Sequence, residues 1–151
     1  MPPPILRPAR AEDIPGIERL LTAESLPLSP MADFLAGFVV LEQAGEVVGA
    51  AGIELYGEAG FLRSVVVTSL LRGTGQADRL VLAALDYAKQ NGARRVYLFT
   101  MNAGNFFARH GFQAVKMDDF ELPVRETWQY AALSRMPEMA KLLTPMRMEL
   151  S

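Results

Sequence analysis

The stretch VVVTSLLRGTGQADRLVLAAL, residues 65–85, places a strand, a glycine-bearing turn and a helix in direct succession. Three β-branched valines open it, two glycines follow, and apolar residues at helical spacing close it. A backbone built in this order presents several N–H groups at a helix N-terminus, which is a common way to bind an anion. The stretch therefore predicts an anion site, and the question is which molecule carries the anion.

The residues before this stretch predict an antiparallel run of strands, because short apolar segments alternate with turn residues. Two strands are expected over 37–56, with a tight turn at Ala44-Gly45-Glu46, and the four residues 57–60 then reverse the chain into a strand at 61–67. Three elements are expected ahead of them: an extended strand at 5–9, an amphipathic helix at 12–24, and a short helix capped by Ser29.

The residues after the valines predict crossovers between strands and helices, beginning with a long helix over 75–90 that ends near Gly92. The later elements are expected to be a strand at 94–100, a short helix at 103–110, a strand at 112–117, a helix from Pro123 through Leu133, and a last strand at 144–150. We therefore predict one domain over 1–151, with a mixed α/β sheet of six to seven strands flanked by about four helices.

The composition excludes several classes of protein. The formal charge is −2 and no run of Lys and Arg exists, which argues against a nucleic-acid partner. There is no cysteine and only one histidine, so no metal site of the Cys or His-rich kind is expected. The opening MPPPILRPAR lacks an apolar signal region, and no apolar run is long enough to cross a bilayer. We expect a cytoplasmic protein without a membrane partner.

Two nucleotide-binding motifs are excluded by the residues around the glycine pair. A P-loop would need Lys followed by Ser or Thr after its second glycine, whereas Gln76 follows Gly75 here. A dinucleotide fingerprint would need a third glycine and an acidic residue at the end of the next strand, which instead reads LFT at 98–100.

The sequence resembles the GCN5-related N-acetyltransferase (GNAT) superfamily in three places. Residues 72–77 fit the pattern Gln/Arg-x-x-Gly-x-Gly/Ala, LRPARAEDI (6–14) resembles the family's opening, and FFARHGF (106–112) resembles its second motif. The resemblance implies an acyl-CoA N-acyltransferase fold and acetyl-CoA as co-substrate, with the pyrophosphate against the turn. The implied cofactor-binding residues are Val65, Val66, Val67, Arg72, Gly73, Thr74, Gly75, Gln76, Ala77, Asn102, Asn105 and Phe107. The alternatives are a turn that only starts a helix, and capping roles for the two asparagines.

Two charges in otherwise apolar strands indicate the acceptor side. If the loop 57–60 is symmetric, Tyr56 pairs with Phe61 and Glu54 with Arg63. One interpretation is an ion pair on a half-solvated face, contributing little. The other places Arg63 against a carboxylate of the acceptor and Glu54 near its amine, as base or counter-charge. Ser64 is expected to point to the opposite face and satisfy a backbone group.

The second motif lacks a proton donor. Many superfamily members have a tyrosine that protonates the departing CoA thiolate, and this position is Phe107 here. Tyr56 and Tyr97 are candidate substitutes, although each also fits an ordinary strand aromatic. His110 is expected to end a short helix beside Gly111 and not to act as a base.

A narrower resemblance is to the branch of the superfamily associated with arsenic-resistance operons. It is carried by GIELYG (52–57), by LRS (62–64) and by ESLPL (24–28), which resembles the acceptor-side loop of that branch. A Cys-Pro pair common in that branch is Met136-Pro137 here, which excludes a thiol contact with arsenic.

The leading hypothesis is an enzyme, an N-acetyltransferase that moves an acetyl group from acetyl-CoA to the primary amine of a small molecule by direct attack in a ternary complex. An amino acid or amino-acid-like toxin would suit Arg63, and the absence of cysteine excludes a cysteinyl acyl-enzyme. The second hypothesis is a non-catalytic acyl-CoA-binding regulatory or partner module, motivated by Phe107. A third is an interaction domain that forms a homodimer through the methionine-rich residues 136–148.

Overall fold

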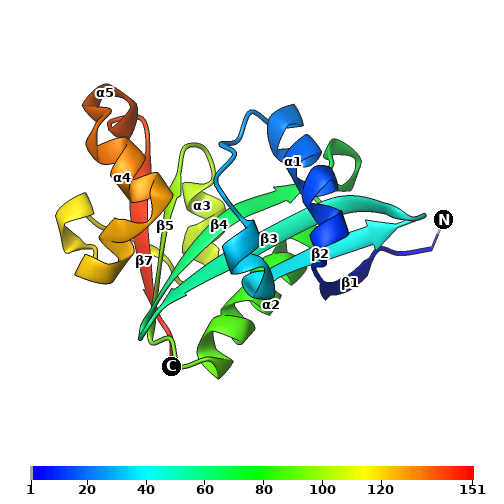
Figure 1. The fold of residues 1–151 in the computed structure, drawn as a ribbon, viewed down its shortest axis with the longest axis horizontal. Coiled ribbons are helices and arrows are strands. Elements are labelled where there is room, and N and C mark those ends of the chain that lie inside the picture. Colours follow the sequence, from blue (N-terminus) through cyan, green and yellow to red (C-terminus); the bar gives the residue numbers. More distant parts are fainter. Residues whose placement is uncertain (1) are drawn as a thin grey trace. The chain divides into compact units, whose positions relative to one another are not determined.

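A computed structural model describes residues 2–151 of the chain (Figure 1). Seven strands lie in one sheet in the order β1-β2-β3-β4-β5-β7-β6 among these described residues. Strands β4 and β5 pair in parallel, whereas β1–β2, β2–β3, β5–β7 and β6–β7 are antiparallel. The strands are β1 Ile5–Pro8, β2 Phe38–Gln43, β3 Glu46–Tyr56, β4 Ala59–Val67, β5 Arg95–Thr100, β6 Gln113–Ala114 and β7 Thr144–Glu149. The expected mixed α/β class and strand number are confirmed.

Helical segments connect the strands. Across residues 2–151 the α-helices are α1 Ile14–Ala23, α2 Gln76–Gln90, α3 Gly104–Arg109, α4 Trp128–Ser134 and α5 Pro137–Ala140. Short 3-10 turns are η1 Ala11–Asp13, η2 Ala32–Gly37, η3 Ser69–Leu71, η4 Met117–Asp119 and η5 Leu122–Glu126. No helix in this described part is long and apolar enough to cross a membrane.

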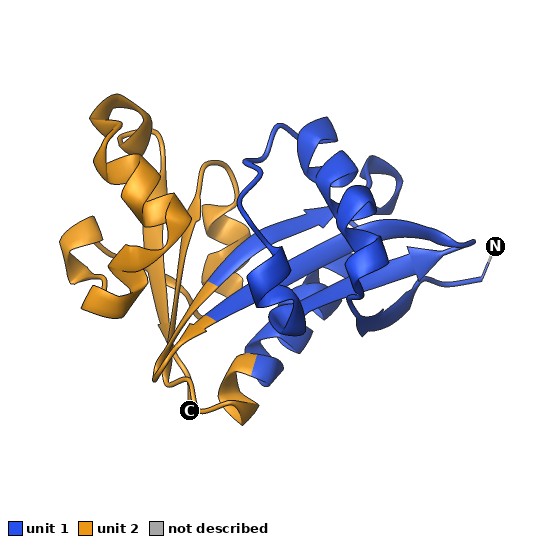
Figure 2. Cartoon of the chain, in the orientation of Figure 1, with its two compact units in different colours: residues 1–54, 62–87 blue, residues 55–61, 88–151 orange. Residues whose placement is uncertain are grey.

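The chain divides into two compact units (Figure 2). Unit 1 consists of Met1–Glu54 and Leu62–Tyr87, and unit 2 of Leu55–Phe61 and Ala88–Ser151. The boundary runs within β3, β4 and α2, so no linker separates the units in the sequence. The single domain over 1–151 stays a prediction.

Unit 1 is built on the hairpin of β2 and β3. Ala44 (φ 53°) and Gly45 (φ 80°) both adopt left-handed backbone, as a two-residue hairpin turn requires. Val40 pairs with Ala50, and both side chains pack with Ile17 of α1 in the core. On the opposite face, the backbone at Gly49 faces side chains of β2 and α2. Helices α1 and α2 therefore cover opposite faces of these strands (Figure 1).

The second hairpin turn is shorter than expected. Strand β3 ends at Tyr56 and β4 begins at Ala59, so the turn has two residues, Gly57 and Glu58, in place of the four residues 57–60. The side-chain period of a strand is two, so a shift by two residues moves opposing pairs without exchanging faces. Glu54 and Arg63 consequently still share a face.

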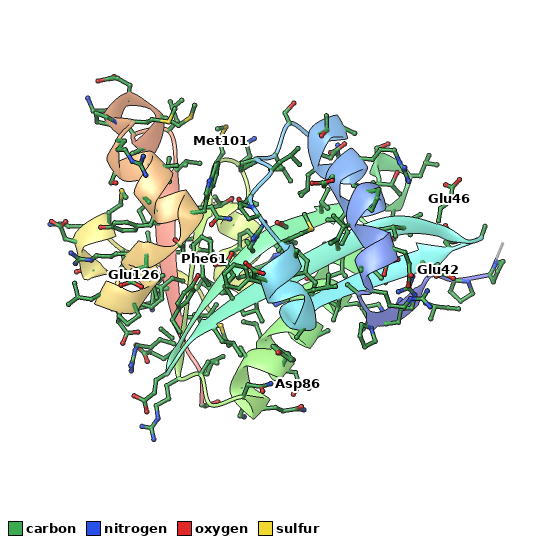
Figure 3. The ribbon with its side chains drawn as sticks, in the orientation of Figure 1. Glu42, Glu46, Phe61, Asp86, Met101 and Glu126 are labelled. Carbon is green, nitrogen blue, oxygen red and sulfur yellow. The ribbon has the colours of Figure 1, made fainter. Side chains whose placement is uncertain are left out.

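Unit 2 has an aromatic core. Residues 59–61 of β4 pair with 95–97 of β5, and β5 pairs along its length with β7. Phe61, Tyr97 and Phe120 are each buried, and the rings of Tyr97 and Phe120 lie 4.7 Å apart. The side chain of Phe61 lies among those that fill this core (Figure 3).

Three expected elements differ from the structure. The helix from Pro123 through Leu133 is broken, because Thr127 is extended (ψ 150°) and uses its side chain to cap α4 by accepting from the N–H of Tyr130. The strand at 112–117 shrinks to Gln113–Ala114, since η4 begins at Met117. Ser29 caps no helix: η2 follows Met31, and the carbonyl of Ser29 accepts from an arginine instead.

Candidate functional site

The glycine turn of unit 1 has the backbone that the sequence predicts. Gly73 (φ 74°) and Gly75 (φ 85°) are left-handed, and no atom lies within 4 Å of a Cβ built at either position. Thr74 closes the turn on the carbonyl of Leu71 through both its N–H and its hydroxyl. Helix α2 starts at Gln76, so the N–H groups of Gln76 and Ala77 have no acceptor inside the helix. The turn is exposed and can bind an anion.

The valines of β4 divide between core and edge. Thr68 donates its N–H to Val48 of β3 at 2.9 Å, and main-chain groups alternate sides along a strand. The main-chain groups of Val65 and Val67 therefore point away from β3, and those of Val66 point toward it. Val66 is buried in the core, whereas its neighbours are half-buried. Val65 and Val67 thus have edge groups that can pair with an extended ligand.

Two arginines flank the glycine turn. Arg72, its first residue, forms an ion pair with Glu24 at the end of α1, and its side chain is 59% exposed. Arg79, one turn into α2, donates to the side chain of Gln76 at 2.7 Å and to the carbonyl of Pro4 at 3.1 Å. The sequence predicted a cofactor role for Arg72 and Gln76 but did not identify Glu24 as a partner.

Glu54 and Arg63 form a buried ion pair. The Nη1 of Arg63 lies 2.8 Å from Oε2 of Glu54, and both side chains are 2% exposed. Arg63 also donates to the carbonyls of Ser29 at 2.9 Å and Pro30 at 2.6 Å. The expected half-solvated face is wrong: the pair is in the interior, where losing one partner would strand a charge.

The surroundings of this pair follow from residue size. The guanidinium carbon of Arg63 lies 5.2 Å from the ring centre of Phe38, within cation–π range. A Cβ at Gly52 would collide with this ring, so glycine is needed at that position. Ser64 is left-handed (φ 59°), and its Oγ accepts from Nε of Arg63 at 3.2 Å, so it supports the arginine and not the expected backbone group.

The second motif lies on α3 in unit 2. Phe107 is buried, with edge-to-face contacts to Phe106 and Phe112. Asn102 and Asn105 are exposed, and neither caps the helix: the N-terminal capping residue is Ala103, with no side-chain capping bond, and its N–H donates to the hydroxyl of Thr100. The capping interpretation of the asparagines is therefore wrong, and their contact with CoA stays a prediction.

His110 lies where it was expected. It follows α3 as the C-terminal capping residue, and its ring lies 5.0 Å from that of Phe106. The next residue, Gly111, is left-handed (φ 101°), which ends the helix.

Tyr97 does not have the surroundings of an exposed proton donor. The Tyr97 hydroxyl is bonded to Glu121 at 3.0 Å, and burial, with Glu121 adding to it, raises the pKa of Tyr97. Glu121 also binds Arg95 through two hydrogen bonds of 2.9 Å, and this guanidinium lowers the pKa of Glu121. Tyr56 packs against the aromatic core of unit 2. Both tyrosines thus fit the interpretation as strand aromatics.

The residues that sequence reasoning missed share one property, which is that their partners are distant in the chain. Glu24, Phe38 and Glu121 contact Arg72, Arg63 and Arg95 respectively. The sequence held a signal for the importance of Glu24, because this residue begins the stretch ESLPL, which resembles an acceptor-side loop of the family. Within residues 2–151, no group of three or more His, Cys, Asp or Glu side chains is placed to hold a metal ion.

The fold and the glycine turn define an acyltransferase-like α/β protein, and comparison with known proteins gives the family. Residues 11–113 match the acetyltransferase (GNAT) family. The chain belongs to this family, which confirms the expected GNAT superfamily.

Several curated relatives are named amino-acid acetyltransferases. That of Neisseria meningitidis serogroup B is 29% identical over 139 residues, which cover 86% of this chain but only 31% of the relative. That of Mycobacterium tuberculosis is 29% identical over 123 residues, covering 75% of this chain and 70% of the relative. The chain therefore spans about a third of the length of the Neisseria relatives.

Solved structures share the fold. The N-acetylglutamate synthase from Neisseria gonorrhoeae, complexed with coenzyme A and N-acetyl-glutamate, has a TM-score of 0.80 at 21% identity and covers 100% of this chain and 36% of that chain. The protein Rv2747 from Mycobacterium tuberculosis, in complex with CoA, has a TM-score of 0.80 at 24% identity. The match covers 98% of this chain and 100% of that chain.

Proposed function

We propose that this chain transfers the acetyl group of acetyl-CoA to the primary amine of a small amino acid or an amino-acid-like molecule. The observation that carries the proposal is the exposed left-handed glycine turn at the start of α2, within the region that matches the GNAT family. The relatives named amino-acid acetyltransferases support an amino-acid acceptor.

The cofactor would bind along unit 1. Its pyrophosphate would accept hydrogen bonds from the N–H groups of the turn and of the first residues of α2, with favourable potential from the helix dipole. Its pantetheine amides would pair with the edge groups of Val65 and Val67. The proposed cofactor-binding residues are Val65, Val66, Val67, Arg72, Gly73, Thr74, Gly75, Gln76 and Ala77 in unit 1, and Asn102, Asn105 and Phe107 in unit 2.

The chemistry is a direct attack. The deprotonated amine nitrogen of the acceptor attacks the thioester carbonyl carbon, a C–N bond forms, and the C–S bond breaks as CoA leaves. The amine proton lost from the intermediate ends on the CoA sulfur. Phe107 has no proton to give and Tyr97 is bonded to Glu121, so we propose that solvent carries this proton.

Arg63 and Glu54 are the proposed acceptor-side residues. Arg63 already holds Glu54 and two main-chain carbonyls, so an acceptor carboxylate would have to replace one of these partners. If it does so, Arg63→Lys raises KM for the acceptor and leaves CoA affinity unchanged. If Arg63 only supports the structure, KM stays near the wild-type value. Tyr56, two residues after Glu54 on β3, is the third proposed residue on the acceptor side.

A second candidate function is a non-catalytic acyl-CoA-binding module. The observation that favours it is Phe107, which is buried among phenylalanines at the position where many family members have a tyrosine. This candidate predicts CoA binding without turnover of any amine. The arsenic-resistance branch, the cytoplasmic location and a homodimer also remain proposals. Acetylation of an arsenic-containing amino acid would support the first of these.

Calorimetric titration with acetyl-CoA and CoA tests the cofactor site. We expect Gly75→Asp to abolish binding, since it adds a negative charge and a strained residue to the turn. Gly92→Asp is the matched control, because Gly92 is also left-handed (φ 90°) and open, but lies beyond the other end of α2. Absence of binding by the folded wild-type chain would overturn the proposal. If binding is found, release of CoA thiol with a panel of amino acids separates the enzyme from the binding module.

A further inference from the structure

The segment 24–31, between α1 and η2, is held at both ends by arginines of unit 1. At its start, Glu24 forms an ion pair with Arg72, the first residue of the glycine turn. At its end, the carbonyls of Ser29 and Pro30 accept from Arg63. One segment therefore joins the proposed cofactor site to the proposed acceptor-side pair.

The two attachments differ in burial. The side chains of Arg72 and Glu24 are 59% and 23% exposed, whereas those of Arg63 and Glu54 are both 2% exposed. An exposed ion pair contributes little to stability and exchanges readily with other ions. A buried charge cannot lose its partner without a large cost. The end of the segment is therefore fixed, and its start is exchangeable.

The start of the segment is also strained. Leu26 donates its N–H to the carbonyl of Leu21 at 2.8 Å, which closes α1 in the manner of a Schellman cap. The left-handed residue of this cap is Ser25 (φ 57°), a position that glycine would fill without cost. Glu24 is the residue before Ser25 in this cap, so the ion pair with Arg72 and the strained residue are adjacent in the chain.

The carboxylate of Glu24 is itself an anion, and it lies beside a turn that is suited to bind an anion. A pyrophosphate carries more charge and more acceptor oxygens than a carboxylate, so it would compete successfully for the Arg72 guanidinium. Once bound, it would repel the Glu24 carboxylate, because both groups are negatively charged.

We propose that Glu24 is a positioning residue that ties segment 24–31 to the glycine turn until the cofactor displaces it. The pyrophosphate takes over Arg72, and the start of the segment is released while Arg63 still holds the end. The acceptor then binds beside the released segment. This inference rests on the proposed function of the glycine turn as a pyrophosphate site.

The first test compares CoA affinity by calorimetry in wild type and Glu24→Gln. Removing the competing carboxylate should tighten CoA binding by about two- to fivefold, as expected for an exposed ion pair. The gain should shrink as salt is added, and it should vanish when Arg72→Gln is also present. Glu12→Gln is the matched control, because Glu12 forms an exposed ion pair with Arg10 on the same unit and should leave affinity unchanged.

The second test follows the segment itself by amide hydrogen exchange. In wild type, CoA should accelerate exchange in residues 24–28 while residues 29–31 change little. In Glu24→Gln, exchange in 24–28 should be fast before CoA is added.

The outcomes separate this inference from the proposed function. If wild type binds CoA but Glu24→Gln binds it equally or more weakly, the inference is overturned and the cofactor site stands. If wild type binds no CoA at all, the proposed function fails and the inference fails with it. Circular dichroism and urea unfolding of each variant establish that it is folded.

Discussion

The two units each contain an arginine bound to a glutamate, and the two pairs have different surroundings. In unit 1, Arg63 and Glu54 are 2% exposed, and the arginine also binds carbonyls 33 and 34 residues away in the sequence. In unit 2, Arg95 and Glu121 are 26% and 32% exposed, and the arginine gives two parallel hydrogen bonds to one carboxylate. The same two residue types thus hold together a buried region in one unit and a partly solvated one in the other.

The difference teaches that burial, more than pairing, sets how much such a pair matters. Water can replace either partner of the Arg95–Glu121 pair, so its loss costs little beyond the hydrogen bonds. Water reaches neither partner of the Arg63–Glu54 pair, so removing one leaves the other as an uncompensated charge.

The largest expected effect is that of Arg63→Ala. It should lower the free energy of unfolding by about 3–5 kcal/mol, because Glu54 and two carbonyls lose their donor in the interior. Arg95→Ala, the control in unit 2, should cost about 1 kcal/mol or less. Urea unfolding followed by circular dichroism measures both. Equal losses in the two variants would refute the comparison.

Asp13 extends the comparison to an intermediate case in unit 1. Its side chain is 6% exposed, and the two oxygens accept from Nη1 and Nη2 of Arg7 at 2.8 and 2.9 Å, while Glu42, labelled in Figure 3, binds the same arginine. Asp13→Asn should cost about 1.5–3 kcal/mol at pH 7, the range for hydrogen bonds to charged groups.

The pH dependence of this loss has a defined sign. Hydrogen bonding by Arg7 lowers the pKa of Asp13, so the unfolded chain binds the proton more tightly than the folded one. The stabilisation is therefore present above the unfolded pKa of about 4 and is lost as pH falls through the folded pKa. The stability difference between wild type and Asp13→Asn should shrink steadily below pH 4. A difference that stays constant to pH 2 would contradict this.

The hydroxyl of Tyr97 belongs to the same hydrogen-bonded group of unit 2 as Arg95 and Glu121. This hydroxyl donates to Glu121, which Arg95 also binds, so Tyr97→Phe removes one of several bonds to the same carboxylate. We expect a loss of about 0.5–1.5 kcal/mol. We also expect unchanged turnover of acetyl-CoA at neutral pH if the chain is active. A large fall in kcat with stability preserved would instead make Tyr97 the proton donor that Phe107 is not.

The smallest expected effect is a gain. Ser25→Gly should stabilise unit 1 by about 0.5–1 kcal/mol, because glycine adopts the left-handed conformation without the cost that serine pays. Ala44→Gly is the matched control, since Ala44 (φ 53°) is also left-handed, but lies in a hairpin turn far from segment 24–31 in the sequence. A destabilising Ser25→Gly would mean that the serine side chain holds the cap.

Local patterns predicted those elements whose cause is local. The helix over 75–90 and the hairpin turn at Ala44 and Gly45 depend on apolar spacing and on residues that accept left-handed backbone, and both are found. The helix expected from Pro123 through Leu133 failed because Thr127 is 1% exposed and adopts extended backbone, which no local pattern indicated. The prediction that Ser29 caps a helix is also wrong. The capping residue of η2 is Met31, and the carbonyl of Ser29 accepts a hydrogen bond from Arg63 of another element.

The residue types and their spacing are enough to predict the family motif, the glycine turn at residues 72–77 and the presence of two charges in apolar strands. Only the tertiary structure decided that Arg63 and Glu54 are buried, that Arg63 holds segment 24–31, and that Glu24 reaches Arg72. The physical reason is that burial and ion pairing depend on distances between side chains that folding brings together from far apart in the chain.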